Sequence, residues 1–394
     1  MQRFTKIYSK TAIIVFNTIL LALCALWILD VAFDLRYTLM GRSNVIHSDQ
    51  IDISSFQLVP SETAKKIAKE YDRWGSDQPF TFNPWTTFMT APFSGPFINV
   101  KKDEVLNYRT NATTRPGSNR LTEKPFVVWA FGGSTMFGYG VSDSLTVPSF
   151  LEQKLAQYIK NRPIQVINFG QPYWYSSVET AAYSALLKSG LLPNVVIFLD
   201  GLNDLSWRMS GYTVPVFAAR AEAAWDHQRK DAKRQLPWVT LNESFPVARF
   251  IKALNYYRNT QPVASDVDPF RAKQIKTAAA LYNDMRINYE MVRVLSEKFG
   301  IKPYIFLQPV PWFGNYDSPV NTEFHFGSRD IARKTYQRLI EATDGELSGL
   351  LFDLSDRLER LKKPYLDSVH YSDAANQHLA DNMADIISRT AVPR

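Results

Sequence analysis

The stretch FVVWAFGGSTMFG, residues Phe126–Gly138, decides the fold of this chain. Six apolar residues in a row, 126–131, are too few for a buried helix and are typical of a buried strand in a parallel sheet. Gly132 and Gly133 follow, and glycine allows the sharp turn that would present Ser134 at the carboxyl edge of the strand. Open α/β sheets bind their ligands at this edge. Taken alone, the stretch also fits a phosphate-binding loop at a helix N-terminus or a plain strand-to-helix connection.

Strand and helix patterns alternate from Phe126 onward. Apolar runs predict strands at 126–131, 164–169, 194–199, 303–307 and 350–354, and helical patterns fall near 147–160, 176–189, 272–299, 328–343 and 373–388. Such alternation is typical of a parallel sheet with helices on both faces. One insertion, roughly 207–271, follows the third strand. We expect it to be a lid or recognition subdomain near the ligand edge, with an elaboration of the packing as the alternative.

The composition bounds the class of protein. A chain of 394 residues with 45% hydrophobic and 13% aromatic content can bury a large core, which excludes a disordered protein. The formal net charge is +7, but the basic residues are spread out, so we predict no nucleic-acid partner and favour proximity to an anionic membrane. The five histidines form no cluster at ligand spacing, and we therefore predict no metal and no other cofactor.

The N-terminal segment predicts a membrane anchor. Residues 1–10 carry three basic and no acidic side chains, and Ala12–Leu29 carries no charge, which fits one membrane-spanning helix. We predict a cytoplasmic tail at 1–10 and an uncleaved transmembrane anchor at 11–33, in preference to a cleaved signal peptide. The basic start predicts a cytoplasmic N-terminus and an extracytoplasmic remainder. Because Cys24 is the only cysteine, that remainder has none, which points to a bacterial inner membrane facing the periplasm.

Residues 34–124 are expected to form an extracytoplasmic stalk and a lead-in segment rich in aromatic residues and proline. The rings between Phe80 and Val100 are interpreted as packing against the main domain, with a sugar-stacking surface as the alternative. Residues 101–124 are polar and predict a loop. Two polar residues of the apolar N-terminal run, Asn17 and Thr18, could contact a membrane-protein partner, although lipid-facing helices tolerate them as well.

Polar residues follow the predicted strands at their carboxyl ends. Ser134 follows the first strand, and its hydroxyl needs a base, for which His370 is the candidate. Asp367, three residues before that histidine, could fix its tautomer. The backbone N–H groups of Ser134 and Gly170 and the side-chain amide of Asn203 are the candidate donors for an oxyanion. Together these residue types predict an acyl-transfer site.

These residues resemble the SGNH (GDSL-type) hydrolase superfamily, which is defined by the Ser, Gly, Asn and His of four ordered blocks. The blocks here are Gly132–Thr135, the block around Gly170, Gly201–Asp204 and Asp367–His370. The resemblance covers residues 125–390. It implies a flavodoxin-like, three-layer α/β fold with a parallel sheet of order 2-1-3-4-5 and Ser-His-Asp ester chemistry, and the donor role of Gly170 rests mainly on it.

One position departs from the pattern of the superfamily. Gly133 stands where the first block usually has an aspartate, which is not a triad member, so no catalytic group is lost. The block looks more like that of membrane-anchored members with a Gly-Gly-Ser-Thr sequence. Tyr173 and Tyr175, which follow the second block, and Gln308, which follows the fourth strand, are candidate substrate-binding residues. Core packing is the alternative role for these side chains.

The function predicted on this resemblance is that of a membrane-anchored, extracytoplasmic serine esterase or deacylase. Its substrate would be an O-acyl ester, with O-acetyl the best guess, of an envelope glycan or lipid. An O-acyltransferase using the same triad with a sugar acceptor is the first alternative, and a dry pocket beneath the 207–271 insertion would favour it. The second alternative is a non-catalytic component of envelope assembly.

Overall fold

The computed structural model describes residues 13–22, 24–25, 51–76, 80–111, 125–210, 276–314 and 328–390. Residues 46–225 and 269–394 form one compact unit, and 1–45 and 226–268 form another. Residues 13–22 are helical, and within the described ranges no helix combines the length and the apolar character needed to cross a membrane. The predicted anchor at 11–33 lies in part, and the insertion at 207–271 mostly, outside the described residues, and both stay predictions.

A parallel sheet organises the larger unit. Its strands are β6 (Phe126–Gly132), β7 (Ile164–Asn168), β8 (Val195–Asp200), β9 (Lys302–Leu307) and β10 (Leu351–Asp353). They lie side by side in the order β7-β6-β8-β9-β10, and every neighbouring pair is parallel. Numbered along the chain, this is the order 2-1-3-4-5 that the resemblance implied. Each predicted strand is confirmed close to its predicted bounds, because buried parallel strands are continuous apolar runs.

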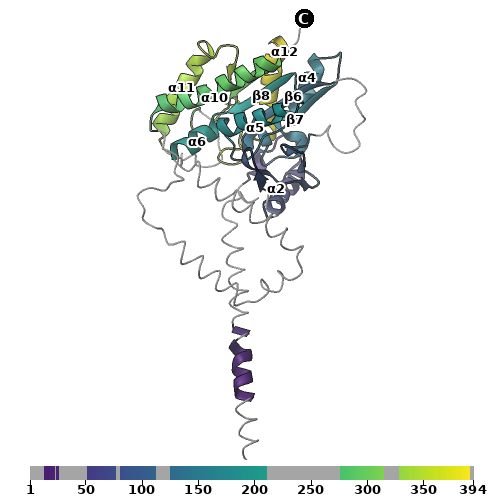
Figure 1. Ribbon diagram of the computed structural model, residues 1–394. Coiled ribbons are helices and arrows are strands. Elements are labelled where there is room, and N and C mark those ends of the chain that lie inside the picture. Colours follow the sequence, from purple (N-terminus) through teal and green to yellow (C-terminus); the bar gives the residue numbers. More distant parts are fainter. Residues whose placement is uncertain are drawn as a thin grey trace, which may run out of the picture. The chain divides into compact units, whose positions relative to one another are not determined.

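Helices cover both faces of the sheet, as predicted. Side chains alternate along each strand, so Trp129 and Phe131 of β6 enter one core while Val128 and Ala130 enter the other. The first core is covered by α5 (Ser176–Lys188), α10 (Ala278–Phe299) and α11 (Arg329–Thr343), which lie together across the sheet in Figure 1. The second core is covered by α4 (Val147–Tyr158) and α12 (Asp373–Thr390). The result is a three-layer α/β architecture.

The lead-in segment joins this unit directly. It contains η3 (Ile53–Ser55), α2 (Ser61–Ser76), the β1–β2 hairpin (Phe80–Asn83 and Thr87–Thr90), β3 (Phe93–Ser94), β4 (Asn99–Lys101) and β5 (Tyr108–Arg109). Strands β5, β4 and β3 continue the sheet beyond β7 in antiparallel fashion. The apolar face of α2 is buried in the same core as α4 and α12. The lead-in therefore covers the edge that β7 would otherwise expose.

The prediction of a loop at 101–124 is wrong for residue 101 and for Tyr108–Arg109, which are in strands. Residue 101 ends β4, and Tyr108–Arg109 forms β5, with Arg109 paired directly opposite Asn168 of β7. The polar pattern hid this strand because the buried side chain is an arginine, whose charge is compensated by partners distant in sequence. Residues 112–124 lie outside the described ranges.

Candidate active site

Ser134 begins the one-turn helix α3 (Ser134–Phe137) at the carboxyl end of β6. The helix closes with the bond from Phe137 N–H to Gly133 O at 3.0 Å, and it ends at Gly138, whose φ of 83° is readily adopted only by glycine. Ser134 is half-buried. No acceptor for its backbone N–H lies in the part of the chain that the structure describes. This N–H is one of the unpaired donors that every helix N-terminus presents.

Ser134, His370 and Asp367 form one hydrogen-bonded chain. The Oγ of Ser134 lies 2.8 Å from Nε2 of His370, and Nδ1 of the same ring lies 2.7 Å from Oδ2 of Asp367. The other oxygen of Asp367 accepts the backbone N–H groups of Val369 and His370, both at 2.8 Å. Ser134 comes from the start of α3, and Asp367 and His370 come from one loop near the C-terminus. Ser134 and His370 are 236 residues apart in sequence.

The charge of Asp367 determines which nitrogen of His370 carries a proton. Burial raises the pKa of Asp367, but the imidazole of His370 and the hydrogen bonds from His370 and Val369 outweigh it, so the pKa lies below its ordinary value. Asp367 is therefore ionised at neutral pH and can only accept hydrogen bonds. Nδ1 of the neutral imidazole must then carry the proton, which leaves Nε2 as the acceptor for the hydroxyl of Ser134. This tautomer suits a general base.

The histidine loop is held from several sides. Leu366 N–H donates to His370 O at 2.7 Å, and the hydroxyl of Tyr371 donates to Pro309 O beyond β9, also at 2.7 Å. The ring of Tyr139, just after α3, stacks on the imidazole of His370 with centroids 4.6 Å apart. Asp367 and His370 are each only 4% exposed. The ring of the histidine is thus fixed by hydrogen bonds at both nitrogens and by stacking on its face.

Asn203 lies beside Gly133, the residue that precedes Ser134. It is in the first turn of α6 (Leu202–Ser210), which follows β8, and its Nδ2 donates to Trp174 O at 2.6 Å. A Cβ atom added to Gly133 would come within 2.3 Å of this Nδ2, so the amide occupies the space that a side chain at 133 would need. The amide has two hydrogens, and the bond to Trp174 uses only one of them. The second is a candidate oxyanion donor.

Gly170 does not offer the donor that was expected of it. Its backbone N–H donates to Oδ1 of Asn168 at 2.9 Å. The glycine has instead a steric role, because a Cβ at this position would lie 2.4 Å from the backbone nitrogen of Phe137. The second block therefore approaches α3 very closely, and the candidate oxyanion donors among the described residues are Ser134 and Asn203.

The candidate substrate-binding residues have different surroundings. Tyr173, with a φ of 71°, packs its ring against Phe80 of the lead-in at 6.0 Å, and Tyr175 is the half-buried N-cap residue of α5. Gln308 is 2% exposed, and its Oε1 accepts the hydroxyl of Thr135, the residue after Ser134, at 3.1 Å. Its Nε2 is buried and has no partner among the described residues. Of the three, Gln308 thus has a contact next to the nucleophile and an unused donor.

Three buried acids lie around the third block. Asp204 accepts the backbone N–H of Ser176 at 3.3 Å and its hydroxyl at 2.5 Å, which fixes the start of α5 against α6. Burial raises the pKa values of Glu179 and Asp200, and the charge of Asp204 raises both further. Both carboxyl groups therefore favour the protonated form more than an exposed carboxyl group does. In the described residues, no group of three or more His, Cys, Asp or Glu side chains is arranged to bind a metal ion.

Sequence reasoning missed three residues that shape the site. Tyr139 stacks on His370, Asn168 holds the N–H of Gly170, and Arg109 contacts the end of α3. Asn168 lies in the predicted strand at 164–169, two residues before Gly170, and this position was the only feature of the sequence that pointed to its role. No pattern marked Tyr139 or Arg109, because their roles depend on contacts between distant segments.

No protein-family model and no curated protein matches this chain. Among solved structures, it is similar to a carbohydrate acetylesterase from Sinorhizobium meliloti, with 14% identity and a TM-score of 0.38. It is also similar to an inhibitor-bound aryl esterase of M. smegmatis, with 13% identity and a TM-score of 0.39, and to a lipolytic G-D-S-L family member from Veillonella parvula, with 10% and 0.37. These alignments cover 67–68% of this chain and 98–99% of the others. The SGNH resemblance of this chain rests on its strand order and its four blocks.

Proposed function

We propose that this chain is an SGNH-type serine ester hydrolase in which Ser134 is the nucleophile. The observation that carries the proposal is the unbroken hydrogen-bonded chain from Ser134 Oγ through His370 to Asp367, with distances of 2.8 and 2.7 Å. A histidine loop on its own often has no catalytic role. Here the imidazole is oriented by a buried carboxylate and touches a serine at a helix N-terminus, which is the arrangement that activates a hydroxyl.

The acylation step follows from this geometry. Nε2 of His370 takes the proton of Ser134 as Oγ attacks the ester carbonyl, and Asp367 stabilises the resulting imidazolium. A tetrahedral intermediate forms, and its oxyanion needs donors that already point at it. The backbone N–H of Ser134 and the second N–H of Asn203 are the two that the described residues supply. The imidazolium then protonates the departing alkoxide, which leaves an acyl group on Ser134.

Deacylation uses the same groups. Nε2 of His370 takes a proton from a water molecule as its oxygen attacks the acyl-enzyme, and the proton returns to Ser134 Oγ when the carboxylic acid leaves. The stacked ring of Tyr139 and the bond to Asp367 keep the imidazole in place through both half-reactions. No step requires a metal ion or an organic cofactor.

The finer part of the proposal concerns substrate and place. We propose that the substrate is an O-acyl ester, specifically an O-acetyl ester, of an envelope glycan or lipid on the extracytoplasmic side of a bacterial inner membrane. The support is the uncharged N-terminal run Ala12–Leu29 behind a basic start, and the single cysteine Cys24 within it. Gln308 is the proposed polar contact to the substrate, because its buried Nε2 is unused.

The test is hydrolysis of p-nitrophenyl acetate and butyrate by the full-length chain and by Ser134→Ala and His370→Ala variants. We expect turnover that is lost in both variants while circular dichroism shows an unchanged fold. Slow hydrolysis that is the same in all three proteins would contradict the proposal. A stoichiometric burst that depends on Ser134, without turnover, would show that the acyl-enzyme waits for an acceptor other than water, as in the transferase alternative.

A further inference from the structure

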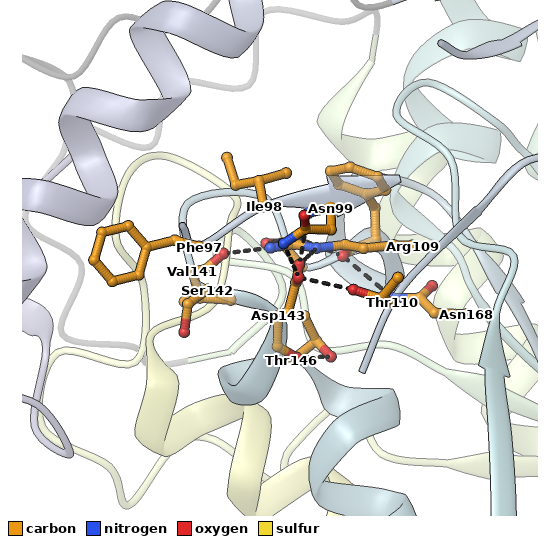
Figure 2. A network of polar contacts seen from close by, with 12 residues as sticks. Phe97, Ile98, Asn99, Arg109, Thr110, Val141, Ser142, Asp143, Thr146 and Asn168 are labelled. Atoms are coloured by element: carbon orange, nitrogen blue, oxygen red, sulfur yellow. Dashed lines mark hydrogen bonds and ion pairs between the residues drawn. The ribbon is translucent and has the colours of Figure 1, made fainter. Parts of the chain in front are cut away.

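Arg109 of the lead-in is buried directly against the end of the nucleophile helix. Its side chain is fully inaccessible, although arginine is almost never fully buried unless it is paired. Nε donates to Oδ1 of Asp143 at 2.9 Å, and the guanidinium lies 4.8 Å from the centroid of the Phe137 ring. Figure 2 shows Arg109 and Asp143 at the centre of a polar network that includes Asn99 and Thr110. The ion pair with Asp143 compensates the charge of Arg109, but it uses only the Nε–H donor of the guanidinium.

The remaining donors of Arg109 point at backbone carbonyls that follow Ser134 and at the hydroxyl of Tyr71. This hydroxyl lies 3.0 Å from Nη1 and itself donates to Gly138 O and Val141 O. Nη1 donates to Phe137 O at 2.9 Å and to Gly138 O at 2.6 Å, and Nη2 donates to Val141 O at 2.6 Å. These carbonyls belong to the last residue of α3 and to the turn after it. A helix of one turn has almost no stability of its own, so its position is set by what holds its ends.

Asn168, opposite Arg109 in the β5–β7 pairing, holds the same helix end. Its Nδ2 lies 3.2 Å from Met136 O and 3.3 Å from Phe137 O, while its Oδ1 accepts the N–H of Gly170. Arg109 and Asn168 thus form a carbonyl clamp, defined here as these two side chains and the carbonyls of residues 136–138 and 141. Asn168 comes from β7 of the parallel sheet, and Arg109 comes from β5 of the lead-in.

The clamp has two routes to the reacting groups. The first is through α3, because a shift of its end moves Ser134 and the backbone N–H that we assign to the oxyanion. The second is through the turn after α3, which carries Tyr139, and the ring of Tyr139 stacks on His370. Both the nucleophile and the base therefore rest on a segment whose carbonyls Arg109 holds.

We propose that Arg109 is a positioning residue for the proposed ester hydrolysis, acting through α3 and Tyr139 without touching the substrate. The inference rests on the proposed function. It assigns to the lead-in, which lies outside the four SGNH blocks, a part in setting the rate of acylation. The chemistry needs a guanidinium, since only its planar set of five donors can reach Asp143 and the three carbonyls at once.

The test separates positioning from folding with a matched pair of variants. The double variant Arg109→Gln with Asp143→Asn removes both charges of the buried pair at once, so neither is left unpaired, and it is compared with the parent chain. Asp143→Asn alone reports the effect of losing the carboxylate. For each, the burst of p-nitrophenol from p-nitrophenyl acetate yields an amplitude, which counts competent sites, and a rate constant, which measures acylation at those sites. Arg109→Lys, which keeps the charge but not the planar fork, is the third variant.

We expect the double variant and Arg109→Lys each to acylate about 100-fold more slowly than the parent chain, because misplacement of a reacting group by about 1 Å has a cost of this size. The pH dependence of the burst rate should also change, since His370 loses part of its support. A purely structural residue would lower the amplitude and the melting temperature while leaving the rate constant per competent site unchanged. That result would overturn the inference. A parent chain with neither a Ser134-dependent burst nor Ser134-dependent turnover would instead overturn the proposed function.

Discussion

Gly133→Asp, which restores the residue usual in the superfamily, should inactivate this chain. The ideal Cβ position at residue 133 lies 2.3 Å from Nδ2 of Asn203 and 3.2 Å from Trp174 O. Real Cβ atoms essentially never approach a heavy atom closer than 3.0 Å, so the amide of Asn203 must retreat by at least the difference, about 0.7 Å. Asn203 would then lose its bond to Trp174 O and its aim at the oxyanion.

The expected cost follows from that displacement. Loss of one oxyanion donor lowers kcat by about 100- to 1,000-fold, or about 2.7–4 kcal/mol of transition-state stabilisation. Gly133→Ala adds the same Cβ without a charge and should show most of the effect. In an Asn203→Ala background the space is free, so adding Gly133→Ala should cost little more than Asn203→Ala alone.

The assay is steady-state hydrolysis of p-nitrophenyl acetate by the two single variants, Gly133→Ala and Asn203→Ala, by their combination and by Gly133→Asp. Folding is checked by circular dichroism. The reasoning is refuted if Gly133→Asp keeps or raises kcat. It is also refuted if Gly133→Ala costs as much in the Asn203→Ala background as in the parent chain, because its effect would then not pass through Asn203.

Three further predictions follow from single residues. Asp367→Asn should lower kcat for p-nitrophenyl acetate by about 10,000-fold with the fold intact. The reason is that an amide N–H facing Nδ1 of His370 forces the proton onto Nε2. A loss of kcat below tenfold would contradict the tautomer assignment. Burial raises the pKa of Glu152 to about 7 from 4.5, so the folded chain binds this proton more tightly and its stability falls as pH rises between these values. Glu152→Gln should therefore raise the free energy of unfolding, measured in urea, by up to about 3 kcal/mol at pH 8 and by little at pH 5. The same gain in unfolding free energy at both pH values would contradict this prediction. Gln308→Met removes the proposed polar contact to the substrate and should lower kcat/KM about tenfold, the equivalent of one hydrogen bond of about 1–1.5 kcal/mol. The free energy of unfolding should change little, because the unpartnered Nε2 is lost together with the bond from Thr135. An unchanged kcat/KM would remove Gln308 from the proposed substrate pocket.

The sheet could be predicted from the sequence because its strands are buried on both faces. Val195–Asp200 and Lys302–Leu307 are nearly continuous apolar runs, and such runs need no knowledge of their neighbours. Ser134, His370 and Asp367 were predicted because parallel strands bring their carboxyl ends to one edge. The structure places all three in hydrogen-bond contact.

The remaining features depend on contacts that no local pattern records. The N–H of Gly170 was expected to face an oxyanion, but Asn168 two residues earlier takes it. Arg109 lay in a stretch predicted to be a loop, and its role appears only when β5 pairs with β7. Burying a guanidinium is favourable only with its partners in place, and these come from sequence positions some 30 residues away. The predicted anchor and the insertion remain predictions, because part of the anchor and most of the insertion lie outside the described ranges.

The most direct test of the central claim is the site of covalent labelling by a fluorophosphonate, which reacts with activated serine hydroxyls. The full-length chain is labelled, digested and analysed by peptide mass spectrometry, with His370→Ala as the comparison. The account predicts one adduct per chain, on Ser134, formed far more slowly in His370→Ala because the base at 2.8 Å is gone. An unlabelled Ser134, or an adduct on another residue at the same rate in both proteins, would contradict it.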